Sequence, residues 1–210
     1  MSTYVEMYNS LPTLGEADDL FVHRDTIFAK LAPLLSKYNH QFGVCLVHAH
    51  CQLDIGEKMV ATGNICEPRD SSSPIDHYPE RWLKSGEPFE FTTNPTPTPP
   101  PDLFSEFQKI IGDVAVLGLY FADGPAGGVK RIEWTEGRKN ITRETTEEEV
   151  LGSANITVET AWLPQCGGGG KTVPETVCQI WCDTRTTRSG NHNKHKGTKT
   201  HGKVPVTRGE

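Results

Sequence analysis

The segment from Gln41 to Leu53, QFGVCLVHAHCQL, constrains the fold more than any other, because two histidines interrupt an apolar run. The side chains of a β-strand alternate between its two faces, so a strand here places His48 and His50 on one face and Cys45 and Cys51 on the other. Buried imidazoles need polar partners, and one metal ion can bind two parallel rings. The segment therefore predicts a metal site with His48 and His50 as ligands. The alternative is a pair of strand histidines that hydrogen-bond to backbone or side-chain acceptors.

A second group of ligand-type residues lies near the C-terminus, at Cys178, Cys182, His192, His195 and His201. On a strand the two cysteines share a face, and the stretch after them has almost no apolar residue to hold it in place. A metal ion could order such a stretch, because its binding energy replaces hydrophobic burial. The spacing fits a Cys2His2 zinc site in its cysteines and only partly in its histidines. The alternative is two buried thiols followed by a disordered basic tail.

Two functions fit these residues. In the first, the protein is a small metalloenzyme whose mononuclear centre is built on His48 and His50, completed by Cys and His residues of the C-terminal segment, and open at one coordination position. In the second, the ion is a closed structural zinc site in a non-enzymatic protein that binds a partner. Zinc is the expected metal because thiolate and imidazole ligands suit it, with copper or iron next.

A family resemblance adds a third ligand. Gly43, His48-X-His50, Glu57 and Gly63 resemble the first metal motif of the cupins, in which a strand led by glycine carries two histidines, a glutamate follows and a glycine closes the turn. The resemblance covers only the chain between the two glycines. It implies a barrel or jelly roll with an open metal face, and a metal oxygenase or isomerase that uses His48, His50 and Glu57.

The hydrophobic pattern predicts an α+β fold, with an N-terminal helix over about residues 26–38 packed on a mainly antiparallel β-sheet. Residues 1–20 are expected to be irregular, and residues 66–88 to form one of several long Pro/Gly-rich loops. A turn at DIGE, residues 54–57, predicts a hairpin that pairs the histidine strand with the segment after it. The two histidines would then face Ala61 and Gly63, beneath open space.

Charge divides the chain into two parts. Residues 185–210 contain seven Lys/Arg and one acidic residue, which leaves 14 basic and 26 acidic residues elsewhere. We predict a single domain over residues 1–183 and a basic, histidine-containing tail over 184–210 that folds back through the metal site or contacts an anionic partner. No aromatic residues accompany the basic ones, which disfavours nucleic acid.

Nothing in the sequence predicts a membrane helix or a secretory signal, because no apolar run approaches 20 residues and the N-terminus has no basic start. We therefore expect a cytoplasmic protein that, if it is an enzyme, acts on a small-molecule substrate. The sequence does not indicate an oligomeric state.

Overall fold

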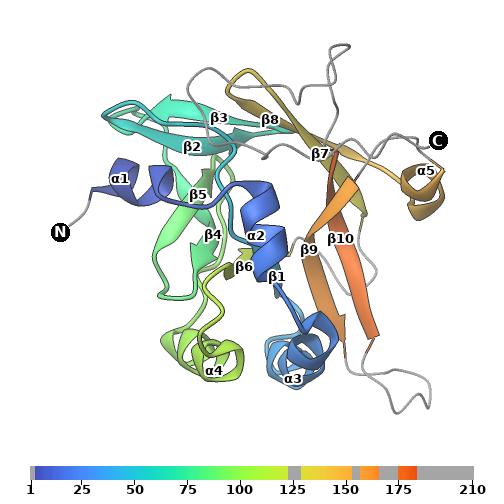
Figure 1. The fold of residues 1–210 in the computed structure, drawn as a ribbon. Helices are drawn as coiled ribbons and strands as arrows, with labels where there is room; N and C mark the ends of the chain where they lie inside the picture. Colours follow the sequence, from blue (N-terminus) through green and yellow to red (C-terminus); the bar gives the residue numbers. More distant parts are fainter. Residues whose placement is uncertain (1–2, 123–128, 153–156, 166–174, 184–210) are drawn as a thin grey trace.

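Ten strands close into a barrel in the part of the chain that the structure describes, residues 3–122, 129–152, 157–165 and 175–183 of a computed structural model (Figure 1). The strands are β1 (Phe42–Leu46), β2 (Glu57–Thr62), β3 (Ile65–Asp70), β4 (Tyr78–Leu83), β5 (Pro88–Thr92), β6 (Leu117–Phe121), β7 (Arg131–Glu136), β8 (Lys139–Glu144), β9 (Thr157–Gln165) and β10 (Glu175–Asp183). Around the barrel they follow the order β1-β6-β4-β5-β2-β3-β8-β7-β10-β9, and β9 pairs with β1 to close the ring.

The predicted α+β fold, with an N-terminal helix packed on a mainly antiparallel sheet, is wrong. The barrel is closed, and β2 pairs with β5, and β7 with β10, in the parallel direction. The error came largely from residues 66–88, which were predicted to be a loop but contain most of β3 and all of β4. Many side chains of these two strands are polar, as side chains lining a barrel interior can be, so they lack the apolar alternation that identifies a strand.

The predicted hairpin at residues 54–57 is also wrong. Strand β2 pairs with β3 in an antiparallel hairpin and with β5 on its other edge, whereas β1 pairs with β6 and β9. The hairpin turn lies at Gly63 and Asn64, where the positive φ of Gly63, 61°, suits a residue without a Cβ. His48 and His50 therefore do not face Ala61 across a ladder.

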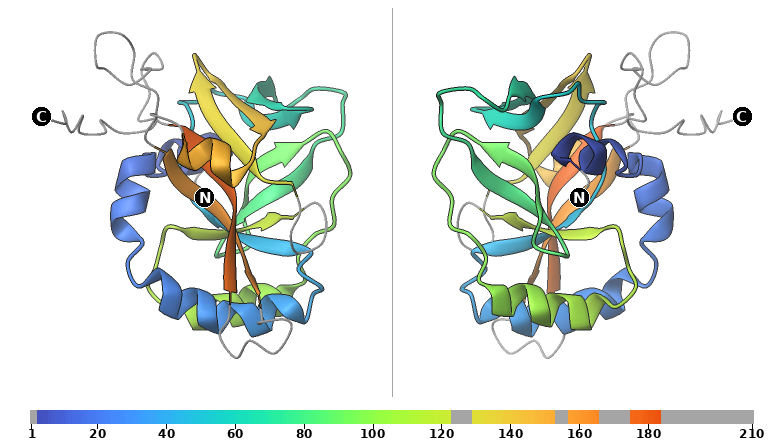
Figure 2. Two further views of the ribbon diagram at one scale, coloured as in Figure 1. Left: turned by 90° about the vertical axis from the view of Figure 1, so that its right-hand side faces the viewer. Right: turned by 90° about the vertical axis from the view of Figure 1, so that its left-hand side faces the viewer.

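Helices cover one end and one side of the barrel. Figure 2 shows α3 (Arg24–Ser36) and α4 (Pro101–Ile111) side by side below the strands. The helix predicted over 26–38 is thus confirmed, within two residues at each end, as α3. The short α5 (Glu147–Leu151) follows β8, and within the described residues no helix is long and apolar enough to cross a membrane.

The N-terminal residues are not irregular as predicted, because they form α1 (Tyr4–Asn9) and α2 (Leu14–Leu20). Each helix begins with a capping box in which a threonine and a glutamate three residues later bond to each other's backbone N–H groups: Thr3 with Glu6, and Thr13 with Glu16. This Thr-X-X-Glu pattern is visible in the sequence and specifies a helix start. Helix α1 packs on β2 and α2 packs on β1.

Strand β1 separates two apolar clusters. Phe42, Val44 and Leu46 belong to a cluster that extends into α2, α3 and α4, whereas Cys45 and Cys51 belong to a second cluster that includes residues of α1. Both thiols are fully buried, as predicted from the alternation of the segment. The domain boundary at residue 183 stays a prediction, because the tail lies outside the described residues.

Candidate metal centre

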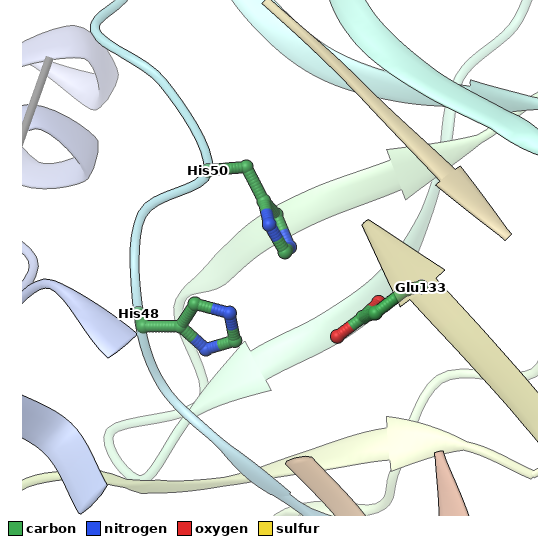
Figure 3. Close-up of side chains that lie close together, drawn as sticks. All are labelled: His48, His50 and Glu133. Carbon is green, nitrogen blue, oxygen red and sulfur yellow. The ribbon is translucent and has the colours of Figure 1, made fainter. Parts of the chain in front are cut away.

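His48 and His50 lie in the extended connection that follows β1, rather than in the strand itself, which ends before them. The backbone N–H of Ala49 donates to the carbonyl of Pro12 over 2.9 Å, and that of His50 donates to the hydroxyl of Tyr8 over 3.1 Å. The N-terminal helices thus hold this connection in place. Both imidazoles point to the same side of this connection, toward Glu133 (Figure 3).

Glu133, from strand β7, points at the two imidazoles (Figure 3), and β10 and β9 lie between its strand and β1 in the ring. One potential ligand atom from each of His48, His50 and Glu133 lies within 4.8 Å of the others. The two rings are 4.6 Å apart between centroids, and none of the three residues is more than 1% exposed. This buried cluster could hold a divalent metal ion, because two imidazoles and one carboxylate are a common ligand set for such ions.

The Glu133 carboxylate is oriented by donors on both of its oxygens. Thr160 donates to Oε1 over 2.9 Å, Asn140 donates to Oε2 over 3.0 Å, and the Arg81 guanidinium lies 3.4 Å from Oε2. Burial by itself would raise the pKa of Glu133, but Arg81, the two imidazoles and Asn140 outweigh it and hold the pKa at about 2. The side chain is therefore an ionised, fixed carboxylate at neutral pH, as a metal ligand must be.

A second buried carboxylate adjoins the cluster. Glu90 lies 3.2 Å from the Arg81 Nε and 3.3 Å from the Nε2 of His50. Burial raises the pKa of Glu90, but Arg81 and His50 lower it more, so the pKa lies below its usual value. One guanidinium, that of Arg81, faces two carboxylates, Glu90 and Glu133, so these three charged side chains carry a net charge of −1. A bound cation would complement that charge.

His48 is held as the neutral tautomer that suits metal binding. Its Nδ1 lies 2.9 Å from the carbonyl oxygen of Leu46, and because a carbonyl only accepts, Nδ1 carries the proton and Nε2 keeps its lone pair. Burial, followed by the neighbouring His50, lowers the pKa of His48 to about 4. A histidine whose second nitrogen bonds to a backbone carbonyl is a typical arrangement around protein-bound metals.

The C-terminal ligands predicted from the sequence do not join this cluster in the described residues. Cys178 donates its thiol to the carbonyl of Ile180 over 3.4 Å, and Cys182 is fully buried in the apolar cluster beneath the barrel. Burial raises the pKa of both thiols far above the usual range, so both stay protonated. His192 and His195, like His201, lie outside the described residues.

Glu57, the third ligand implied by the cupin resemblance, is engaged elsewhere. It accepts a hydrogen bond from Nη1 of Arg138 over 3.1 Å and one from the backbone N–H of Asp54 over 2.7 Å. The carboxylate beside the histidines is instead Glu133, which lies 83 residues beyond His50 in the chain. The ligand set His48, His50 and Glu57 is therefore not assembled.

A polar cavity of about 610 Å³ lies within the ring of strands and is lined by side chains from eight of them. Arg81, Glu90 and Asn140 line it, and each of these contacts a member of the histidine and glutamate cluster. The three cluster residues do not line the cavity themselves, because Arg81, Glu90 and Asn140 lie between them and it. The volume is within the range of small-molecule sites.

Glu133 and Glu90 were not identified from the sequence. Each stands at the centre of a strand between two large apolar residues, in Ile-Glu-Trp and Phe-Glu-Phe respectively. An acidic residue in that position is a signal for a polar side chain inside a barrel, but it says nothing about which other strand it faces. Comparisons of the chain with protein-family models, with curated proteins and with solved structures give no match.

Proposed function

We propose that the protein is a metalloenzyme in which His48, His50 and Glu133 bind one divalent metal ion inside the barrel. The observation that carries this proposal is the meeting of three buried ligand-type side chains, one of them an ionised carboxylate, within 4.8 Å. Two of the three have a fixed orientation before any ion binds: His48 through Leu46, and Glu133 through Thr160 and Asn140. Hydrogen-bond partners that orient the ligands in this way also affect how tightly a site binds its metal.

The ligand number favours catalysis over a structural role. Structural zinc sites are usually closed by four protein ligands, commonly with cysteine, whereas catalytic sites have three protein ligands and keep a position for water or substrate. Among the described residues the cluster supplies three, and neither Cys178 nor Cys182, which a structural site was expected to use, is one of them. The adjacent cavity of about 610 Å³ gives a small substrate a place to bind.

An ion held here would act as a Lewis acid toward bound water or substrate. Zinc is the metal we expect, because a His2Glu set is one of its catalytic ligand sets. Iron(II) is the second candidate, because two histidines and one carboxylate also form the facial triad of non-haem iron sites. Arg81 and Glu90, which separate the cluster from the cavity, would hold the carboxylate and His50 in place.

Metal titration of the full chain tests the proposal. After removal of metal with a chelator, calorimetry with zinc should show one ion bound per chain, and a His48→Ala/His50→Ala variant should lose that binding. Cys178→Ala/Cys182→Ala is the matched control and should keep it. The proposal is overturned if the chain binds no zinc, or if the histidine variant binds it as the unchanged protein does.

A second measurement separates an open site from a closed one. Manganese(II) loaded into the site should speed the relaxation of solvent water protons if a coordination position is left to water. A loaded protein with no such effect would have a closed site, and the enzyme assignment would then be wrong even though the metal assignment held.

A further inference from the structure

Arg131, on the wall of the polar cavity, is an arginine without an ion-pair partner among the described residues. Arg131 lies on β7 two residues before Glu133, so the two side chains share the face of the strand that turns into the barrel. Its guanidinium makes no hydrogen bond or ion pair with any group in the described residues. Arg81, also on the cavity wall, is engaged by two glutamates, and Arg143 by Glu149.

The net charge of the buried ionised groups on and behind the cavity wall becomes positive when the metal site is filled. Of the deeply buried charges there, Arg81 carries +1, and Glu90 and Glu133 carry −1 each, so a divalent ion converts a net −1 into a net +1. Two further glutamates line the cavity: Glu80, which is half-buried, and Glu144, which is exposed at the rim, where water and salt screen its charge. A buried excess charge is costly unless an opposite charge approaches it.

The neutral part of the wall suits a ligand with further oxygen atoms. Thr92, Asn140 and Thr142 line the same cavity and offer hydroxyl and amide groups, and two of the three are buried. The side-chain amide of Asn140 donates a hydrogen bond to Glu133, so this residue contacts both the cavity and a proposed metal ligand. These groups can bind hydroxyl or carbonyl oxygens through hydrogen bonds.

We propose that the substrate is a small hydroxy- or oxo-carboxylic acid, whose carboxylate is bound by Arg131 and whose second oxygen-bearing group points toward the metal. This rests on the metal centre proposed above, because only the loaded centre changes the net charge of Arg81, Glu90 and Glu133 with their ion to +1. Arg131 and the ion then both favour a negative ligand, and the polar wall selects one with more than a carboxylate to bind. Arg131 is thus assigned as the specificity-determining residue.

Lactate and its neutral amide, lactamide, form a matched pair of probes. With the cobalt(II)-loaded full chain, broadening of the probe's methyl proton signal measures binding near the ion. Lactate should bind at least about tenfold more tightly than lactamide, since hydrogen bonds to a charged partner are worth more than neutral ones. Arg131→Gln should remove most of that difference and leave cobalt affinity unchanged, which also shows that the variant is folded.

Arg143→Gln is the control, because that guanidinium is already paired with Glu149 at the surface. It should leave lactate binding as it is. Equal affinity for lactate and lactamide overturns the proposal, as does an Arg131→Gln variant that behaves like Arg143→Gln. If the unchanged chain does not bind cobalt at all, the metal centre itself fails, so the two failures are distinguishable.

Discussion

Replacing Glu133 with glutamine separates the proposed role of this residue as a metal ligand from its role in the fold. The Arg81 Nη2 lies 3.4 Å from the carboxylate, and two unit charges at that distance attract each other by about 5 kcal/mol in a medium of effective dielectric near 20. Most of this attraction is offset, because the glutamine no longer has a charge to desolvate and no longer repels Glu90. The amide can also keep the hydrogen bonds, since its oxygen accepts from Asn140 and its NH₂ donates to the hydroxyl of Thr160.

We therefore expect Glu133→Gln to lower the free energy of unfolding of the metal-free protein by only about 1–2 kcal/mol. Glu133→Ala should lower it by about 3–5 kcal/mol, because it removes the whole side chain and leaves buried donors without an acceptor. Urea unfolding in the presence of a chelator measures both. The difference between the two variants reports the hydrogen bonds rather than the charge.

The zinc affinity should respond differently. Loss of an outer partner commonly lowers metal affinity by about 10–100-fold, so loss of the carboxylate ligand itself should lower it by more than about 100-fold. Glu90→Gln is the matched control, because it removes an equally buried charge that contacts Arg81 and His50 but is not one of the three ligands. If the two glutamine variants lose the same affinity in calorimetry, Glu133 acts only through charge and is not a ligand.

Three further changes test the fold and the state of the histidine. Gly43→Ala should lower the free energy of unfolding by about 1–3 kcal/mol, because a Cβ there would lie 2.3 Å from Cε1 of Tyr120 and 2.7 Å from the carbonyl oxygen of Trp162. An unchanged urea midpoint would show that the backbone of Gly43 does not approach these atoms so closely. Thr13→Ala should cost about 1 kcal/mol in the same assay, since it removes the capping box of α2, and a neutral result would mean that the cap is not formed. Burial lowers the pKa of His48 from 6.5 to about 4, so the unfolded chain binds a proton more readily than the folded chain does. The free energy of unfolding of the metal-free protein should therefore fall by up to about 3 kcal/mol as the pH drops from 6.5 to 4. Urea unfolding at several pH values should show that His48→Gln removes this part of the pH dependence.

The histidine half of the site could be predicted because it is local. His48 and His50 are two residues apart in an extended segment, and extension alone puts both rings on one side. The two rings do lie on one side, although β1 ends at Leu46, before both histidines. Glu133 could not be predicted in the same way, because its approach to the histidines depends on the closure of the barrel through β10 and β9 to β1.

The fold was harder to predict than its elements. Helices α3 and α4 and the strands β6, β7, β9 and β10 follow apolar patterns that the sequence displays clearly. Strands β3 and β4 do not, since many of their residues are polar or proline, and pairing with neighbours on both sides of the barrel outweighs their weak intrinsic preference for strand. Without them, the remaining strands indicate an open sheet rather than a ring.

The charges inside the barrel argue for function rather than stability. Burying Arg81, Glu90 and Glu133 together requires that each be desolvated, and buried ionic groups are often no more stabilising than apolar side chains of the same volume. A core serving stability alone would be served as well by leucine or methionine at these positions. The arrangement has an excess negative charge, a histidine fixed in its metal-binding tautomer and a carboxylate fixed by two donors, all beside a cavity of about 610 Å³. A bound cation would account for both the excess charge and the tautomer, whereas a purely structural network accounts only for the hydrogen bonds.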